Sequence, residues 1–141
     1  MNEALWRGVP TGLTILECWA ISQWLWAVRP QWVLASGKGH GWITDCLTVV
    51  SPGGTVVPVS DLDVAPSVKV QGRIHHQDRV MGVFEDETTG LRLAQWAALI
   101  TPGSGIGCAH NAATVAAFLR ASPEFRQRET VGRLTWLERR L

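Results

Sequence analysis

The chain has 141 residues, with 13 Lys and Arg against 12 Asp and Glu, so its net charge is close to zero. This length fits a single domain over residues 1–141, and the charge balance excludes a generically basic nucleic-acid binder and an acidic, solvating tail. Apolar residues make up 46% of the chain and charged residues 18%, which excludes disorder because ample apolar surface offsets chain entropy. Eight tryptophans are present, and most of them lie in residues 1–35.

The most apolar stretch, Leu13–Val28, predicts a helix. Either Thr11 or Thr14 can cap its N-terminus, and Pro30 ends it because the residue before a proline avoids helical angles. Glu17 interrupts the stretch, which is also shorter than the roughly 20 mostly apolar residues that span a bilayer, so we expect no transmembrane segment. The chain does not open with a secretion signal, which predicts a cytoplasmic protein at synthesis.

The tryptophans of this N-terminal helical segment, residues 1–35, predict an interaction surface. Apolar residues cover most faces of the helix, which indicates burial on more than one side or docking on a partner. Tryptophan is enriched among the anchors of protein interfaces. We therefore expect Trp19, Trp24 and Trp26 to contact a protein partner.

The middle of the chain predicts antiparallel strands. Trp42–Val50 and Thr55–Val59 are rich in β-branched residues and flank Ser51-Pro52-Gly53-Gly54, a combination typical of a β-hairpin. Shorter runs predict further strands at Gln31–Ala35, Val68–Ile74 and Arg79–Phe84.

The last third of the chain predicts helices. Leu91–Ile100 has amphipathic spacing, and Cys108–Leu119 is rich in small residues. Ser122 followed by Pro123 is typical of a helix start, which predicts an Arg-rich C-terminal helix over residues 122–141. The order of helix, antiparallel strands and helices predicts an α+β fold.

Cys108 is the candidate nucleophile. It follows the glycine-rich segment that contains Gly105 and Gly107, and we expect it at the first turn of a helix. The partial positive charge of a helix N-terminus favours the thiolate, which is the nucleophilic form. Backbone amides around Gly107 and Cys108, in the loop that contains Gly105, would stabilise an oxyanion. A small buried core residue is the other interpretation of Cys108.

His40 is the candidate base, because it stands just before the first predicted hairpin strand. A base on a strand that faces a Cys-bearing helix is the arrangement of Cys–His catalysis. Asp45 lies within the same strand, but a carboxylate beside a thiol raises the pKa of the thiol and makes a poor partner. A solvated loop histidine is the alternative interpretation of His40.

Together these segments resemble a known family. Residues 44–57 (TDCLTVVSPGGTVV) look like the central hairpin of NlpC-type papain-like cysteine peptidases, and residues 108–115 (CAHNAATV) look like their nucleophile helix. The order, with the hairpin first, resembles the circularly permuted branch that includes lecithin retinol acyltransferase-like proteins. The resemblance covers residues 39–119 and implies a papain-like core in which a small antiparallel sheet packs on the Cys-bearing helix.

The resemblance implies a cysteine hydrolase that cleaves amide bonds in peptidoglycan peptides, without a cofactor. Cys108 would be the nucleophile and His40 the base, oriented by Asp61 or Asp63. The family places its base a few residues before the hairpin turn, where this chain has Asp45. Either His40 serves instead, or the chain is a catalytically inactive scaffold with a structural role, for example in a virion-associated phage tail.

Other candidate sites carry weaker signals. Cys18 could act as the nucleophile of an unpermuted enzyme with His75 or His76 as its base. Those two histidines could also bind a metal with His40 and Cys46, but adjacent residues on a strand point to opposite faces, and we expect no metal site. Residues 103–107 resemble a phosphate loop that lacks the following Lys-Ser/Thr pair. Three cysteines without paired spacing indicate free thiols in a reducing compartment.

Overall fold

The computed structural model describes residues 3–36, 40–59, 74–75, 77–85 and 90–141, which contain four helices and eight strands. The fold is therefore mixed α/β. The chain begins with an antiparallel hairpin of β1 (Glu3–Trp6) and β2 (Val9–Thr14). The remaining elements are α1 (Ile15–Val28), β3 (Trp32–Ser36), α2 (His40–Val50), β4 (Thr55–Pro58), β5 (Val80–Phe84), α3 (Gly90–Ala97), β6 (Gly105–Cys108), α4 (Ala112–Ala121), β7 (Phe125–Val131) and β8 (Leu134–Arg139).

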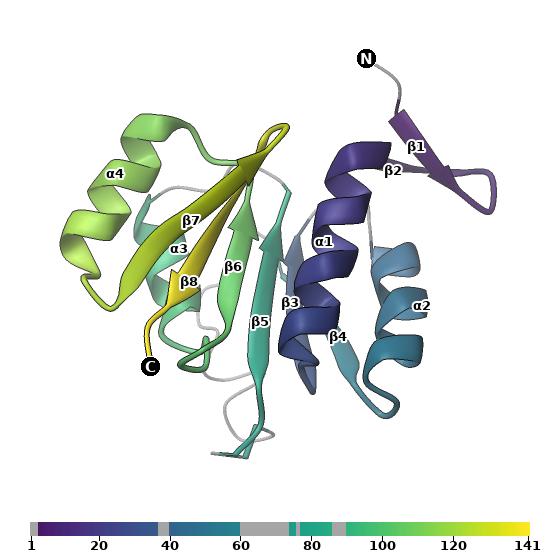
Figure 1. The fold of residues 1–141 in the computed structure, drawn as a ribbon, viewed down its shortest axis with the longest axis horizontal. Helices are drawn as coiled ribbons and strands as arrows, with labels where there is room; N and C mark the ends of the chain where they lie inside the picture. The colour runs from purple at the N-terminus through teal and green to yellow at the C-terminus, as the bar shows by residue number, and fades with distance from the viewer. Residues whose placement is uncertain (1–2, 37–39, 60–73, 76, 86–89) are drawn as a thin grey trace.

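A six-stranded sheet with the order β4-β3-β5-β6-β8-β7 forms the centre of the molecule (Figure 1). The strands β4, β3, β5 and β6 are mutually parallel, and β8 runs antiparallel to both of its neighbours. The prediction of a small antiparallel sheet on a Cys-bearing helix is therefore wrong. The helix α2 follows β3 and returns the chain to the edge where β3 began, so that β4 runs parallel to β3.

Helices cover both faces of this sheet. One apolar layer joins α1 and α2 to the sheet through residues such as Trp24, Leu47 and Val83. The other joins α3 and α4 to it through residues such as Trp96 and Phe118. Alternation along the strands divides the side chains between the two layers, so the chain is a three-layer α/β unit.

The N-terminal helix was predicted correctly. Its N-cap is Thr14, whose Oγ1 accepts a hydrogen bond from Glu17 N at 3.1 Å, while Glu17 Oε1 accepts one from Thr14 N at 2.9 Å. This reciprocal pair is a capping box. The helix ends at Val28, and Arg29 adopts a left-handed conformation with φ 49° before Pro30.

The first strand of the predicted central hairpin is instead the helix α2. Trp42, Ile43, Leu47 and Val50 are buried on one side of it, whereas Thr44 is exposed. This spacing follows the helical period and buries the apolar face in the layer that α2 shares with α1 and the sheet. The predicted turn at Ser51–Gly53 is present but joins a helix to β4.

The predicted C-terminal helix is the hairpin β7–β8. Ser122 follows α4 as its C-cap and does not start a new helix. Gly132 lies in the turn with φ 59°, a left-handed conformation that glycine adopts readily. The predicted strand at Val68–Ile74 falls almost entirely outside the described residues. No helix in the described ranges has the length and apolar character needed to cross a bilayer.

Candidate functional site

Cys108 is the last residue of β6 and does not start a helix. The helix that follows begins at Ala112, and its N-cap is Asn111, whose side chain accepts a hydrogen bond from Thr114 N at 2.8 Å. The Cys108 side chain is fully buried in the layer of α3 and α4. Burial raises the pKa of its thiol to about 11, against a smaller lowering by a hydrogen bond from the His110 backbone. The predicted activation by a helix N-terminus is therefore absent.

The structure does not bring Cys108 together with the helix that carries His40. Register pairs Ser36 with Phe84 and Phe84 with Cys108, which separates the end of β3 from Cys108 by two strand spacings, roughly 10 Å. The helix α2, which starts at His40, packs on the opposite face of the sheet from the Cys108 side chain. The predicted orienting residues Asp61 and Asp63 lie outside the described residues.

Asp45, the other candidate base, holds the N-terminal hairpin. Its Oδ2 accepts a hydrogen bond from Trp6 Nε1 at 2.6 Å and lies 3.7 Å from Arg7 Nη2. It belongs to α2, on the opposite face from the Cys108 side chain. Asp45 therefore fixes β1 against α2.

Gly105 and Gly107 belong to β6 and do not form an oxyanion loop. A Cβ atom at Gly105 would lie 2.7 Å from Trp136, and one at Gly107 would lie 2.6 Å from Trp24. These glycines let two indole rings lie directly on the sheet, which is a packing role.

The predicted interaction residues separate into two kinds. Trp24 is buried, stacks on Trp136 with 4.9 Å between ring centroids, and donates from Nε1 to Glu129 at 2.7 Å. It is a core residue, because α1 presents it to the sheet. Trp19 and Trp26 are 56% and 46% exposed, so these two keep the exposure that an interface anchor needs.

The alternative pair of Cys18 and His75 lies at opposite ends of the sheet. The C-terminal end of α1 lies at the edge where β3 starts. Its N-terminal end, which carries Cys18, therefore lies at the opposite, carboxyl edge. His75 N donates to Asp78 Oδ2, which also accepts from Trp32 Nε1 at the start of β3. The length of β3 separates the two residues, so they form no dyad.

We expect Cys108 to resist alkylation in the folded protein. With a pKa of about 11, its thiolate fraction at pH 7.5 is on the order of 100-fold lower than that of an unperturbed thiol, and the side chain is buried. Mass spectrometry after a timed iodoacetamide pulse should find Cys18 and Cys46 labelled first, and all three labelled equally in urea. Fastest labelling at Cys108 would instead support the nucleophile hypothesis.

Buried polar side chains follow three neighbouring strands at the carboxyl edge of the sheet. Ser36 ends β3, Glu85 comes directly after β5, and His110 follows β6 by two residues. Their exposed fractions are 2%, 8% and 5%. Ser36 Oγ has no hydrogen-bond partner among the described residues. Polar groups buried in this way are costly unless something completes their hydrogen bonds.

The order in which strands are added to the sheet reverses beside these residues. From β3 the chain moves outward to β4, and it then returns to the other side of β3 to form β5. In open α/β sheets, ligands bind outside the carboxyl ends of the strands where the strand order reverses. Ser36 and Glu85 end the two strands that flank this switch point, which makes them the centre of the candidate site.

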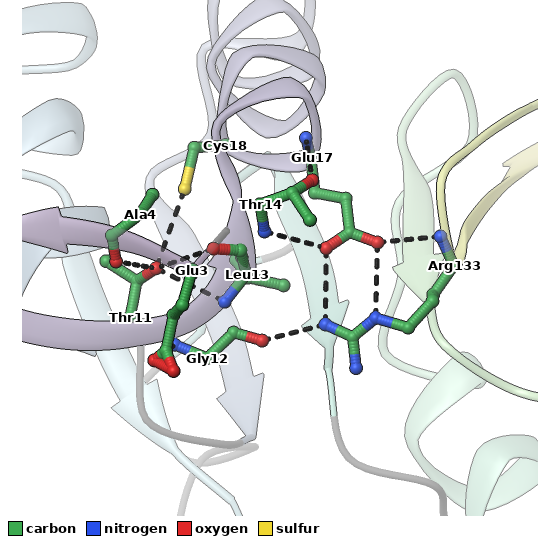
Figure 2. Close-up of polar contacts among 9 residues, drawn as sticks. All are labelled: Glu3, Ala4, Thr11, Gly12, Leu13, Thr14, Glu17, Cys18 and Arg133. Carbon is green, nitrogen blue, oxygen red and sulfur yellow. Dashed lines mark hydrogen bonds and ion pairs between the residues drawn. The ribbon is translucent and has the colours of Figure 1, made fainter. Parts of the chain in front are cut away.

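An ion pair between the buried Glu17 and the partly exposed Arg133 fixes α1 at the same edge. Figure 2 shows the Glu17 carboxylate between Thr14 and Arg133. It accepts from Arg133 N at 2.6 Å and from Nη2 and Nε of Arg133 at 3.2 and 3.3 Å. Burial acts to raise the pKa of Glu17, but the hydrogen bonds from Arg133 and Thr14 outweigh it and hold the pKa below its ordinary value. The pair joins the start of α1 to the β7–β8 turn.

A sequence signal for this site was present at residues 37–41. The segment Gly37-Lys38-Gly39-His40-Gly41 follows the apolar run that forms β3 and leads into α2. Glycine-rich turns between a strand and a helix are typical of nucleotide-binding α/β folds. Residues 37–39 lie outside the described residues, so the signal is one of sequence alone.

Comparison with known proteins supports the fold. No protein-family model matches the sequence, and no curated protein matches it. A solved structure described as "cmcI-N160 SAH" matches with a TM-score of 0.62 over 98% of this chain and 83% of that chain, at 14% sequence identity. At this identity the likeness concerns the fold alone: this chain shares the three-layer α/β architecture of a protein whose description names SAH.

Proposed function

We propose that this chain binds an S-adenosyl nucleoside at the carboxyl edge of its sheet and acts in methyl transfer. The observation that carries the proposal is the pair of buried polar residues, Ser36 and Glu85, at the switch point of the sheet. The similar structure names SAH, which we read as S-adenosylhomocysteine. This compound is what remains of S-adenosylmethionine after its methyl group has been transferred. The proposal departs from the expectation of a protein without a cofactor.

The residues at this edge suit such a ligand. A buried hydroxyl without a partner costs on the order of 1–3 kcal/mol, and a ligand that bonds to Ser36 Oγ removes that cost. The Glu85 carboxylate can accept hydrogen bonds from ribose hydroxyls. The N-terminus of α2 lies four residues beyond Ser36, and helix N-termini favour negatively charged ligand groups. The residues present therefore fit the nucleoside.

The chemistry divides between ligand and protein. S-Adenosylmethionine, when bound, supplies a methyl group on a positively charged sulfur. The protein contributes position and exclusion of water, since the described polar side chains at this edge, Ser36, Glu85 and His110, are buried. His110 carries an imidazole at the same edge, and a neutral imidazole can take the proton that an acceptor loses.

We expect Ser36→Ala to weaken the binding of S-adenosylhomocysteine about tenfold, which corresponds to about 1.4 kcal/mol. The lost group is a hydroxyl that meets the ligand in the proposed complex. Isothermal titration calorimetry of the full chain measures the affinity directly. Glu85→Gln should weaken it as well, because an amide replaces a carboxylate that accepts from ribose.

The matched control is Ser104→Ala. Ser104 is also 2% exposed, and its Oγ also has no hydrogen-bond partner among the described residues, but it lies before β6 at the amino edge. The control should leave the affinity unchanged. Equal effects of the two substitutions, or no binding by the wild-type chain at about 1 mM ligand, would contradict the proposal.

Amide hydrolysis by Cys108 stays a prediction, which the alkylation experiment tests. A structural role through the exposed Trp19 and Trp26 also stays a prediction. Neither hypothesis gains support from the geometry around Cys108, which is buried in an apolar layer.

A further inference from the structure

One part of the molecule carries almost all the large apolar side chains that are exposed to solvent. Among the described residues, every such side chain except the C-terminal Leu141 belongs to the β1–β2 hairpin, α1 or α2. Figure 1 shows α1 and α2 side by side, with the hairpin at one end of them. The apolar surface, as we name it, consists of Trp6, Ile15, Leu16, Trp19, Trp26 and Val49.

Two adjoining hollows make the apolar surface continuous. Trp6 lines one hollow together with Ile15 and Trp19. It lines the other together with Trp26 and Val49. The exposed side chains of the hairpin and of both helices therefore form one surface and are not scattered singly, which is the ordinary condition of exposed apolar residues.

The exposed side of α1 carries no charge. Glu17 is the only acidic or basic residue in this helix, and it is fully buried and bonded to Arg133. Besides its large apolar residues, α1 exposes Gln23 and Ala27. A surface helix of a globular protein normally turns charged and polar residues to the solvent, whereas a helix that is apolar on all sides is buried. The exposed side of α1 therefore has the composition of a covered one.

The area of the apolar surface is that of a protein interface. Its six side chains are between 38% and 73% exposed, and at about 150–250 Å² for a large side chain they present on the order of 700 Å². The largest apolar patch on a typical monomer covers about 300–600 Å². Each partner in a complex of standard size buries about 800 Å², so a single partner can cover the apolar surface.

The lack of charge selects the kind of partner. The charged groups at the edge are met within the chain: Arg7 lies 3.7 Å from Asp45, and the guanidinium of Arg29 lies over the Trp26 ring at 5.1 Å. A partner that placed its own charged residues against the centre of this surface would bury them unpaired, which is costly. The partner surface must therefore be apolar too. A second copy of this chain supplies one, and interfaces between identical subunits are more apolar than those of transient complexes.

The sequence of α1 suits a two-fold axis. Trp19 and Trp26 are seven residues apart, close to two helical turns, so they lie on the same side of the helix. Antiparallel packing of two copies of α1 about a point next to Gln23 places Trp19 of each copy opposite Trp26 of the other. The two Gln23 side chains then meet at the axis, where each amide can both donate and accept a hydrogen bond. The same patch on both copies thus complements itself, as a two-fold interface requires.

We propose that two copies of this chain form a dimer through the apolar surface, with α1 antiparallel to α1 of the second copy. The proposal does not rest on the methyl-transfer function, because it uses neither Ser36 nor Glu85.

Sedimentation velocity of the full chain tests the dimer. The chain has a mass of 15.5 kDa, and the wild-type protein should sediment at twice this mass at about 10 µM, since complexes of this size have dissociation constants from micromolar to picomolar. Trp19→Glu should weaken association at least 100-fold, because the two-fold axis places the new charge in the interface twice. The control Leu141→Glu changes an exposed apolar residue outside the surface, and should leave the mass unchanged.

A second variant keeps the test valid if Trp19→Glu does not fold, which circular dichroism checks. Trp26 is 46% exposed, and Trp26→Glu should also weaken association at least 100-fold. A wild-type dimer that persists in both folded variants overturns the assignment of the apolar surface as the interface.

Engineered cysteines test the arrangement of the helices. In a chain that carries Cys18→Ser and Cys46→Ser, Gln23→Cys should give a disulfide-linked dimer with oxidised glutathione, because residue 23 meets its own counterpart. The control Ala27→Cys should give none. Its two copies would be about 13 Å apart along the helix axis, beyond the roughly 7 Å between Cα atoms that a disulfide spans. Linkage at residue 27 and not at residue 23 on a non-reducing gel overturns the antiparallel arrangement.

A wild-type chain that stays monomeric at about 100 µM, a concentration far above the expected dissociation constant, overturns the dimer. The same sample is then centrifuged with vesicles of phosphatidylcholine and phosphatidylglycerol. Sedimentation of the monomer with the vesicles, lost in Trp19→Glu, would assign the apolar surface to a lipid membrane in place of a second copy.

Discussion

Glu17→Gln is expected to lower the free energy of unfolding by about 2–3 kcal/mol. Glu17 is fully buried and accepts three hydrogen bonds from Arg133 and one from Thr14. A glutamine amide keeps the volume but turns a donor toward the Arg133 donors, so that buried groups lose their partners. Urea unfolding at pH 7 measures the loss. Glu3→Gln is the control, because Glu3 is exposed and accepts one hydrogen bond from Gly12 N at 3.1 Å.

The same pair predicts a pH dependence. The pKa of Glu17 in the folded chain is below its ordinary value, so its contribution is fully present above the ordinary pKa of about 4.3. It is lost as the pH falls through the lowered folded value. The difference in the free energy of unfolding between wild type and Glu17→Gln should therefore shrink as the pH falls from 5 through the lowered pKa of Glu17. A difference that stays constant over this range would contradict the role of the charge.

Elements with local signals were predictable from the sequence. Thr14 caps the start of α1 and Pro30 follows its end, as expected. The β-branched runs predicted β3 and β5. These signals depend on residues within one turn or one strand of each other. They do not require knowledge of what packs against the element.

The helix α2 shows where local propensity fails. Its sequence, HGWITDCLTVV, is rich in β-branched residues and precedes a Pro-Gly-Gly turn. The same residues also place Trp42, Leu47 and Val50 on one helical face. Tertiary packing decides between the two structures, because α2 buries that face in the layer that it shares with α1 and the sheet. Tertiary packing overrides propensities that differ by less than about 1 kcal/mol per residue.

The candidate site was harder to predict than the elements. Ser36, Glu85 and His110 are far apart in the chain and lie at one edge only because β3, β5 and β6 are neighbours in the sheet. Strand order is a long-range property that apolar patterning does not contain. The ion pair of Glu17 with Arg133 has the same character, since 116 residues separate its members. The glycine-rich run before Cys108 is by contrast a local pattern, so the sequence alone displays it.

Gly107→Ala is expected to lower the free energy of unfolding by about 2–3 kcal/mol. The added Cβ would lie 2.6 Å from Trp24 Cζ3 and 3.0 Å from Cε3. Trp24 has little freedom to move, because it stacks on Trp136 and donates to Glu129. The backbone of Gly107 is held between β5 and β8, where it pairs with Val83 and Trp136. The clash must therefore be relieved by displacing the packed layer of α1.

A double-variant cycle in urea separates this clash from a general cost of substitution in β6. Trp24→Phe removes the part of the indole ring that Cβ would meet, so the combined variant should lose at least 1 kcal/mol less than the two single losses added together. Gly41→Ala is the control: its Cβ would meet nothing within 4 Å, and it lies in the first turn of α2. Alanine should leave stability unchanged there or raise it by up to about 1 kcal/mol. Additive losses at Gly107 and Trp24 would show that β6 does not need glycine to accommodate the indole.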